Sequence, residues 1–468
     1  MYIEQIYTNC LSEASYFIES EGKAIVIDPI RDTDKYLQLA KDKNATIEYI
    51  FETHFHADFV SGHLELAAQT NAPIVYGPNA ETSFPIHKAK DGEVIQLGKI
   101  SFTILHTPGH TLESTCYLLK DENGNDHAIF TGDTLFVGDV GRPDLFSGNM
   151  TKEELADMLF DSLQNKIKPL HDAVIVYPAH GPGSACGKAL GKETFSTIGI
   201  QKATNYALKH TDRLDFIDEV TSGLNAPPPY FPINATINKK GHDLLGDIMN
   251  NVKALSVDEF AALINDDTIL LDTRTADQFT EGFIPNSLFI GLDGRFAEWA
   301  GTLLPFNADI LLIADEGKEQ EAATRLARVG LDNIKGYLKG GFDAWKNSGK
   351  TCDLIINVEA DELRIDMQYD ADKMAIIDVR KPTEYEAGHI DVAENFSLAD
   401  LEKEIEDLPE HKNLYVHCAG GYRSVIAASI MKQHGFHQLR NVIGGWGAIT
   451  KIDDMPIELP QPKNAELN

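Results

Sequence analysis

Four short hydrophobic segments in the first 180 residues each run into a polar segment. The hydrophobic segments have the length and the β-branched and aromatic content of buried strands, and they cover residues 47–51, 100–104, 127–130 and 173–176. The polar segments that follow them cover residues 53–58, 106–111, 131–134 and 180–181. Because polar groups at the ends of neighbouring strands lie on one rim of a sheet, the pattern predicts a single site on that rim.

The second half of the chain repeats one pattern of strands and helices. Residues 270–274 match residues 376–380 at an offset of 106, since Asp272 corresponds to Asp378. Each copy has a strand ending in Asp-x-Arg, a Gly-x-Ile turn, a second apolar strand, a helix and a Gly-Gly pair. Alternating strands and helices predict a small parallel sheet with both faces covered.

The chain length and one proline-rich segment indicate how the domains divide. A chain of 468 residues is too long for one hydrophobic core. The segment 226–232 contains four prolines, too many for a helix or a central strand, and therefore marks a strap near the end of the first domain. The predicted domains cover residues 1–250, 251–352 and 353–468.

Histidine and carboxylate residues in the polar segments form a candidate metal site. His54, His56 and Asp58 lie within five residues, where two imidazoles and a carboxylate can face one ion from a tight turn. Later segments add three further candidates, His110, Asp133 and His180. The first segment matches the metal-binding signature T-H-x-H-x-D-H except that Phe59 replaces its last histidine. Since phenylalanine cannot bind a metal, this replacement bears on how many metals the site holds.

The motif set resembles the metallo-β-lactamase superfold over roughly residues 1–250. That resemblance implies an αββα sandwich. Hydrolases of this fold such as glyoxalase II bind two metals and need the histidine that Phe59 replaces. The remaining residues resemble the persulfide dioxygenase branch, which implies one Fe(II) per chain bound by His54, His110 and Asp133. The same resemblance makes His56, Asp58 and His180 groups that orient the ligands or contact bound water.

Three other residues of this domain each allow two interpretations. Arg142, with Asp144 in a G-R-x-D segment that resembles the dioxygenases, could bind a carboxylate or phosphate of a thiol carrier, or it could simply brace the loop. His63 could replace the missing histidine, but a helix-surface role is the favoured interpretation. Cys186 could act as a sulfur relay near the metal, but a packing role is favoured.

The last repeat carries a cysteine at a turn from a strand into a helix. Cys418 begins the segment C-A-G-G-Y-R, in which the backbone of Gly420 and Gly421 and the charge of Arg423 would stabilise a thiolate and lower its pKa. The two repeats resemble the rhodanese fold, and the C-x-x-x-x-R spacing resembles sulfurtransferases. In the middle repeat Asp315 falls about where Cys418 should be, so we predict that this copy is catalytically silent. The resulting fold class is α/β multidomain, a metallo-β-lactamase sandwich followed by two rhodanese-like domains.

Composition narrows the possible partners. A formal charge of −31 argues against nucleic acid and anionic membranes, and no segment resembles a membrane span or a signal peptide. Five scattered cysteines do not form a disulfide framework and suit a reducing compartment. We therefore expect a cytoplasmic protein that acts on small molecules, and a homo-oligomer.

The combined motifs predict oxidation of a persulfide of glutathione, coenzyme A or inorganic sulfur by O₂ to give sulfite. This reaction would be coupled through a Cys418 persulfide to the formation or use of thiosulfate. The sequence does not set the direction of sulfur flow. Two alternatives remain, a two-metal thioester hydrolase of the glyoxalase II type with an appended sulfurtransferase, and a non-enzymatic sulfur carrier with a scaffold domain.

Overall fold

The computed structural model describes residues 1–145, 150–224 and 226–460, which form two compact units. The first unit comprises the described residues between 1 and 249 with the short segments 300–302 and 324–332. The second unit comprises residues 250–299, 303–323 and 333–460. The two short segments in the first unit come from the middle copy of the repeat.

Two six-stranded sheets form the centre of the first unit. The first sheet has the order β1-β2-β3-β4-β5-β6, and the second has the order β12-β11-β10-β9-β8-β7. The strands of the first sheet are β1 Tyr2–Thr8, β2 Glu13–Ser20, β3 Lys23–Ile27, β4 Thr46–Phe51, β5 Ile74–Tyr76 and β6 His87–Lys88. Those of the second are β7 Val94–Leu97, β8 Ile100–His106, β9 Thr115–Lys120, β10 Asp126–Gly132, β11 Ile175–Pro178 and β12 Ser196–Thr197.

The facing sides of the two sheets form one hydrophobic core. Alternate residues of β8 are buried, and Phe102 contacts Phe51 of the other sheet at a ring distance of 5.4 Å. Tyr16 and Phe130 make a similar contact at 4.9 Å. Strands with one face in this core and the other under helices bury both faces, which explains their nearly continuous hydrophobic sequences.

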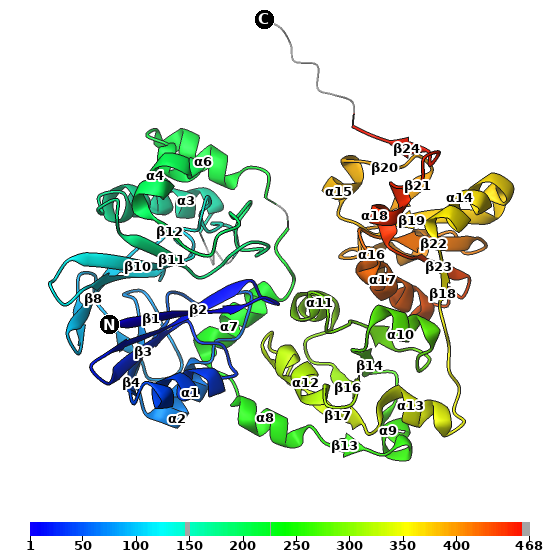
Figure 1. Cartoon of the computed structure of the whole chain (residues 1–468), viewed down its shortest axis with the longest axis horizontal. Helices are drawn as coiled ribbons and strands as arrows, with labels where there is room; N and C mark the ends of the chain where they lie inside the picture. The colour runs from blue at the N-terminus through cyan, green and yellow to red at the C-terminus, as the bar shows by residue number, and fades with distance from the viewer. Residues whose placement is uncertain (146–149, 225, 461–468) are drawn as a thin grey trace, which may run out of the picture. The chain divides into compact units, whose positions relative to one another are not determined.

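Helices cover the outer faces of both sheets (Figure 1). Helices α1 and α2 lie beside β3 and β4, whereas α3, α4 and α6 lie beside β10, β11 and β12. The helices of this region are α1 Asp34–Asp42, α2 His63–Thr70, α3 Lys152–Ser162, α4 Ile198–Thr204, α5 Tyr206–Lys209, α6 Arg213–Thr221, α7 Phe231–Lys240 and α8 Leu245–Asn251. The predicted αββα order is confirmed.

The proline-rich segment differs from its prediction at its end. Helix α7 begins at Phe231, so Pro232 lies in its first turn. Proline is tolerated there because the first amide groups of a helix have no partner within the helix. The prediction that residues 226–232 exclude a helix was therefore wrong for the last two of them.

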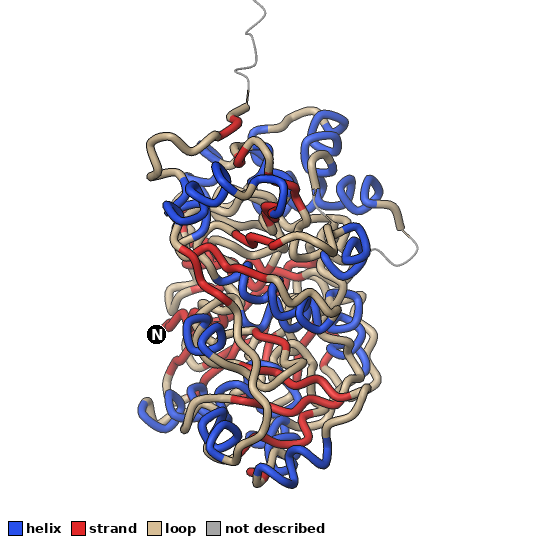
Figure 2. The backbone as a smooth tube through the Cα atoms, turned by 90° about the vertical axis from the view of Figure 1, so that its right-hand side faces the viewer, coloured by secondary structure: helices blue, strands red, loops and turns tan. Residues whose placement is uncertain are grey.

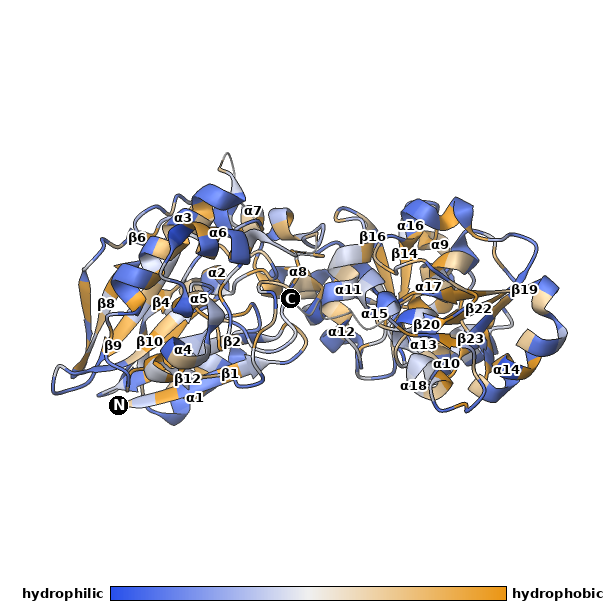
Figure 3. Ribbon diagram, turned by 90° about the horizontal axis from the view of Figure 1, so that it is seen from above, coloured by the Kyte–Doolittle hydropathy of each residue, from blue (hydrophilic) through white to orange (hydrophobic). Residues whose placement is uncertain are grey.

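Two five-stranded parallel sheets form the second unit, with the orders β13-β17-β16-β14-β15 and β18-β23-β22-β19-β21. Strands and helices alternate along it. Figure 2 shows the helices in blue and the strands in red, and the central strands β14, β22 and β19 are hydrophobic (Figure 3). The strands of the first sheet are β13 Ala254–Leu255, β14 Thr268–Asp272, β15 Leu288–Phe289, β16 Asp309–Ile313 and β17 Ile334–Leu338. Those of the second are β18 Ile356–Val358, β19 Met374–Asp378, β21 Ala393–Asn395, β22 Asn413–His417 and β23 Leu439–Val442. A short pair joins β20 His389–Ile390 to β24 Ile457–Glu458.

The helices around the two parallel sheets confirm the prediction that both faces are covered. They are α9 Val257–Leu263, α10 Ala276–Glu281, α11 Phe296–Leu303, α12 Glu319–Ala327 and α13 Gly341–Asn347 in the middle copy. In the last copy they are α14 Ala360–Tyr369, α15 Pro382–Glu386, α16 Leu401–Glu404, α17 Tyr422–Gln433 and α18 Gly445–Ile449. Among the described residues, none of the helices is long and apolar enough to cross a membrane.

The strand register identifies which residues of the two copies correspond. Asp272 pairs with Ile313, and Asp378 pairs with His417. The residue that follows Ile313 is Ala314, so Ala314 and not Asp315 occupies the place of Cys418. The prediction for Asp315 was therefore wrong by one residue. The offset between the copies is 106 at the first strand (272 to 378) and 104 here (313 to 417), so the first strand alone does not locate this position.

Candidate functional site

The three predicted iron ligands come together at the rim of the sandwich. His54 follows β4, His110 lies between β8 and β9, and Asp133 follows β10. Asp133 Oδ2 lies 3.7 Å from His54 Nε2 and 3.4 Å from His110 Nε2. All three side chains are buried. Ligand atoms at such separations can share one metal ion, because three atoms about 2 Å from a metal lie roughly 3 to 3.5 Å apart.

Hydrogen bonds at the far side of each imidazole leave the inner nitrogen available. His110 Nδ1 donates to the carbonyl oxygen of Arg142 at 2.8 Å, which places the lone pair on Nε2. His54 Nδ1 is 2.9 Å from the hydroxyl of Thr53. Burial lowers the pKa of His54 well below its usual value, and the neighbouring histidines lower it further. The ring is therefore neutral, the form that binds metals.

Among the described residues, no nitrogen or oxygen donor makes a hydrogen bond to the buried carboxylate oxygens of Asp133, and the Cys186 thiol is a weak donor beside them. Burying a carboxylate without a partner costs several kcal/mol, roughly, so groups in this state are normally satisfied by an ion or by water. Both oxygens face histidine nitrogens that are also available as ligands. The residues present therefore fit a metal ion, although the ion itself has to be identified from chemistry.

His56, Asp58 and His180 form a second group next to the first. His180 Nε2 lies 3.5 Å from Asp58 Oδ2 and 3.6 Å from Asp133 Oδ1. Nitrogen or oxygen atoms of His56, Asp58 and His180 lie within 4.8 Å of one another. Phe59 is fully buried, and its ring lies 4.4 Å from the ring of His56. The position that carries the last histidine of the signature is thus filled by a packed hydrocarbon ring.

Two carboxylates on strand ends hold His56 from one side. Its Nε2 lies 3.2 Å from Asp28 Oδ1 and 3.7 Å from Glu52 Oε2. Burial alone would lower the pKa of His56, but the charges of Asp28, Glu52 and Asp58 and the Asp28 hydrogen bond raise it to about 10. Neither carboxylate was a predicted site residue, and each occurs in a hydrophobic strand context that gives no signal for it.

Asn238 of α7 holds the turn that carries the histidines. Its side-chain amide donates to the carbonyl oxygens of His56 and Phe59, both at 2.8 Å, and its oxygen accepts from the Ser61 amide at 2.8 Å. The whole side chain is buried. Sequence reasoning missed this residue, because it lies far along the chain from the turn and belongs to no motif.

Replacing Asn238 with alanine is expected to destabilise the first unit by about 3 kcal/mol, since two buried carbonyls and one buried amide lose their partner. Asn234, one turn earlier on the same helix, is a matched control because it is equally buried and its side chain has no hydrogen-bond partner. The measurement is hydrogen exchange of peptides from residues 46–70 across a urea series. The free energy of unfolding should fall more for Asn238→Ala than for Asn234→Ala. Equal losses for the two variants would mean that packing of α7, and not this bonding, holds the turn.

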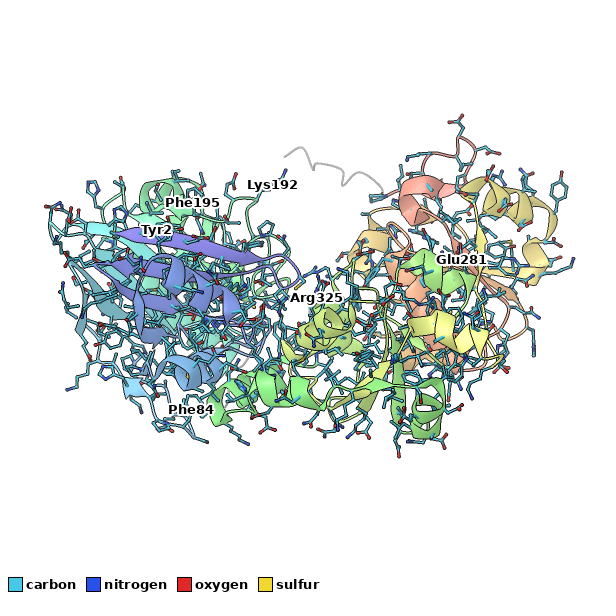
Figure 4. All side chains as sticks on the ribbon, turned by 60° about the horizontal axis from the view of Figure 1, so that its bottom comes forward. Tyr2, Phe84, Lys192, Phe195, Glu281 and Arg325 are labelled. Carbon is cyan, nitrogen blue, oxygen red and sulfur yellow. The ribbon has the colours of Figure 1, made fainter. Side chains whose placement is uncertain are left out.

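His63 does not lie on the surface, so the favoured prediction for it was wrong. It is the first residue of α2, it is fully buried, and its Nδ1 lies 3.4 Å from Glu52 Oε1. Its ring stacks on Phe84, labelled in Figure 4, at 5.0 Å. Within the described ranges, the groups of possible ligands around Asp133 do not include His63.

The loop after Asp133 shows the bracing interaction that was one of the two interpretations. Arg142 donates to both carboxylate oxygens of Asp144, at 2.9 and 2.7 Å. A role for the two residues in substrate binding stays a prediction. Cys186 is buried beside Asp133 and His180, and burial followed by the charges of Asp58 and Asp133 raises its pKa well above the usual value. A protonated thiol is a poor nucleophile, which weighs against a sulfur relay.

In the second unit, Cys418 lies between β22 and α17 as predicted. The Gly421 amide donates to Cys418 Sγ at 3.1 Å, and the Ser424 hydroxyl lies 3.6 Å from the same sulfur. Gly421 has a φ of 108°, which favours glycine. A Cβ atom on Gly445 would lie 2.3 Å from the Cys418 carbonyl oxygen, so the closing Gly-Gly pair allows the loop to close tightly.

Arg423 contacts a carboxylate from a different helix. Its two terminal nitrogens donate to the two oxygens of Glu384 on α15, at 2.6 and 2.8 Å. These hydrogen bonds raise the pKa of Arg423, and the charge of Cys418 raises it further. The guanidinium therefore lies within electrostatic range of the sulfur but is held by Glu384, a partner that the sequence did not predict.

The middle copy lacks both the cysteine and the arginine of this loop. Ala314 stands at the place of Cys418, and at the same offset of 104 (319 to 423) Glu319 stands at the place of Arg423. A methyl group cannot carry sulfur and a carboxylate repels anions, so these residues support the prediction that this copy is silent.

Comparison with known proteins identifies the two parts of the chain separately. A family model described as the metallo-beta-lactamase superfamily matches residues 8–180, and one described as a rhodanese-like domain matches residues 256–348 and 360–451. A hydroxyacylglutathione hydrolase from Francisella tularensis subsp. novicida (strain U112) is 34% identical over 173 residues. That match covers 37% of this chain and 64% of the hydrolase, less than two thirds of its length.

Two solved structures extend the comparison. A metallo-beta-lactamase from Staphylococcus aureus subsp. aureus COL is 35% identical, covers 72% of this chain and 98% of its own, and gives a TM-score of 0.65. A structure titled ETHE1 from Myxococcus xanthus is 30% identical and covers 51% of this chain and 98% of its own, with a TM-score of 0.44.

Proposed function

Since this chain belongs to the metallo-beta-lactamase superfamily and carries two rhodanese-like domains, we propose that it oxidises persulfides and transfers sulfane sulfur. The observation that carries the proposal is the replacement of the last signature histidine by the buried Phe59. It leaves His54, His110 and Asp133 as a two-histidine, one-carboxylate set in a chain that also carries rhodanese-like domains. One Fe(II) per chain is the ion that this set suits best.

Two features of the ligand set favour an oxygenase over a hydrolase. Three protein ligands on one face would leave positions open on Fe(II), so that a persulfide sulfur and O₂ can both bind. The imidazoles cannot turn away from the ion, since Thr53 and the Arg142 carbonyl hold their outer nitrogens. The reaction is R–S–SH + O₂ + H₂O → R–SH + SO₃²⁻ + 2 H⁺, in which the sulfane sulfur loses four electrons and O₂ gains them.

The substrate is a low-molecular-weight persulfide whose thiol carrier is glutathione, coenzyme A or inorganic sulfide. Arg142 and Asp144 follow the metal ligand Asp133 closely in the chain, and their mutual ion pair presents one guanidinium in a fixed position. We assign them to the binding of the carrier, with the Arg142 backbone also positioning His110.

Cys418 would carry sulfur as a persulfide. Sulfite attacks its terminal sulfur, the sulfur–sulfur bond breaks, and the electron pair returns to Cys418 as a thiolate, giving thiosulfate. The backbone amide of Gly421 is placed to stabilise that thiolate, and Gly420 completes the turn. The reverse reaction would charge Cys418 from thiosulfate. Joining the two activities in one chain raises the effective concentration of sulfite at the second site.

The test is to count metals and to follow O₂ in one experiment. The Fe(II)-loaded protein is given glutathione persulfide, coenzyme A persulfide or inorganic persulfide, and O₂ uptake and sulfite are measured. We expect one iron per chain, uptake with at least one carrier, and one sulfite per O₂ when free sulfite and thiosulfate are counted together. Two zinc ions per chain with no O₂ uptake would contradict the proposal.

A thioester hydrolase is the second candidate, because a curated relative of the first domain is a hydroxyacylglutathione hydrolase. His56, Asp58 and His180 could contribute to a second metal beside Asp133. The same preparation distinguishes the two candidates when it is also given a hydroxyacyl-glutathione thioester. Hydrolysis that requires two metals would favour this candidate.

A further inference from the structure

Arg423 has two possible anionic partners, the carboxylate of Glu384 and the sulfur substrate at the Cys418 loop. Arg423 is five residues after Cys418 and close enough for the charge of that cysteine to affect it. The substrates of sulfur transfer are anions, so this guanidinium is the positive side chain of the C-A-G-G-Y-R segment that can attract them. Both of its terminal nitrogens nevertheless donate to Glu384.

Glu384 is ionised and only partly shielded from water. The hydrogen bonds from Arg423 lower the pKa of Glu384 below its usual value. Side-chain exposure is 17% for Arg423 and 35% for Glu384, so a small solute can reach the pair. A carboxylate held in this way occupies the same two nitrogens that a sulfite or thiosulfate oxygen would use.

The middle copy shows that the helix does not need a charge at this position. Gln278 corresponds to Glu384 at the offset of 106 (278 to 384). Gln278 Oε1 accepts from the Thr275 amide at 2.9 Å, and Glu384 Oε2 accepts from the Lys381 amide at 3.1 Å, so both side chains cap the start of their helix. Where the arginine is absent, the same position is neutral.

We propose that Glu384 competes with the anionic sulfur substrate for Arg423. Glu384 binds Arg423 until sulfite or thiosulfate displaces it. Glu384 thereby acts as a positioning residue that sets how tightly anions bind beside Cys418 and how readily the anionic product leaves. This inference rests on the proposed sulfur transfer at Cys418. Glu384 would control how tightly anions bind at this site, whereas the Cys418 thiolate carries out the reaction.

The test compares the alkylation of Cys418 by a charged and by a neutral reagent. Iodoacetate and iodoacetamide are applied to the full-length protein, and modification of the peptide that contains Cys418 is followed by mass spectrometry. Glu384→Gln keeps the helix cap and frees Arg423, so the ratio of the iodoacetate rate to the iodoacetamide rate should rise about fivefold, the factor equivalent to roughly 1 kcal/mol. A ratio that falls or stays the same would overturn the proposal.

Two further variants separate this effect from a general change in charge. Glu386→Gln removes the same charge from an exposed residue of the same helix and should leave the ratio unaltered. In an Arg423→Ala background, Glu384→Gln should have no effect on the ratio, because Glu384 acts through Arg423. An equal rise from Glu386→Gln, or a rise that survives without Arg423, would show that net charge and not the ion pair controls access.

Enzyme kinetics give an independent readout. In transfer from thiosulfate to cyanide, Glu384→Gln should lower the KM for thiosulfate by about fivefold without raising kcat. If the wild-type protein transfers no sulfur, the proposed function fails while the alkylation ratio still tests the ion pair. If it transfers sulfur and both measurements are unaffected by Glu384→Gln, the inference about Glu384 alone is wrong.

Discussion

Replacing Asp133 with alanine is expected to abolish persulfide oxidation, with a loss of at least about a thousandfold in O₂ uptake. The reason is that Asp133 Oδ2 lies between the inner nitrogens of His54 and His110, so the remaining ligands cannot hold an ion alone. Iron content should fall from one per chain to nearly none. Thiosulfate-to-cyanide transfer should be retained, because Cys418 belongs to the other unit.

The metal-free forms add a second measurement for this variant. Asp133→Ala removes a buried carboxylate to which no nitrogen or oxygen donor of the described residues makes a hydrogen bond, so the metal-free variant should unfold at a higher urea concentration than the metal-free wild type. Asp126→Ala, at the other end of β10, removes the same charge from a half-buried residue and serves as the control. Retention of iron by Asp133→Ala would show that another residue completes the site.

Replacing Cys418 with serine is expected to lower sulfur transfer by at least about a thousandfold, because a hydroxyl neither forms a persulfide nor ionises near neutral pH. Uptake of O₂ should be unaffected. The product of persulfide oxidation should then accumulate as sulfite without thiosulfate. The measurement is the ratio of sulfite to thiosulfate formed from one persulfide preparation.

Cys352→Ser is the matched control for this change. Cys352 is exposed at the boundary between the two copies of the repeat, so its replacement alters the thiol count without touching the loop. It should leave both activities intact. If Cys418→Ser still produced thiosulfate enzymatically, the sulfur would have to pass through another thiol.

The sequence could predict that the three proposed metal ligands lie together, because each of them follows a recognisable hydrophobic strand. His54 follows a strand of the first sheet, and His110 and Asp133 follow strands of the second, so the packing of the two sheets brings these strand ends together. The same logic predicted the turn at Cys418. Strand ends are therefore positions where a local pattern is enough to anticipate a tertiary arrangement.

Residues that support the site from a distance could not be found in this way. Asn238 contacts the carbonyl oxygens of His56 and Phe59 from a helix that follows the proline-rich strap. Its side chain acts through backbone groups, which place no constraint on residue type at the other end and leave no motif. His63 was misplaced for a related reason, since a histidine at a helix start gives no sign of the buried Glu52 opposite it.

The repeat shows how a small change in spacing misleads a sequence comparison. Two additional residues between β14 and β16 of the middle copy change the offset between the copies from 106 to 104, so the first strand does not locate the residue that corresponds to Cys418, which is Ala314 and not Asp315. Spacing along the chain does not fix strand register, which is set by hydrogen bonding and by burial. Glu384 was missed because its partner Arg423 lies on a different helix.

The contact between the two copies has a consequence for transplanting the sulfur-transfer module. Tyr422, within the C-A-G-G-Y-R segment, donates to the carbonyl oxygen of Gly291 at 2.8 Å, and a Cβ atom on Gly294 would lie 2.3 Å from its ring. The Ser429 hydroxyl accepts from the Phe289 amide at 3.0 Å. The middle copy thus provides the surface against which the reactive loop of the last copy packs. Transfer of the last copy to another scaffold would therefore also require transfer of the segment of the middle copy that contacts this loop.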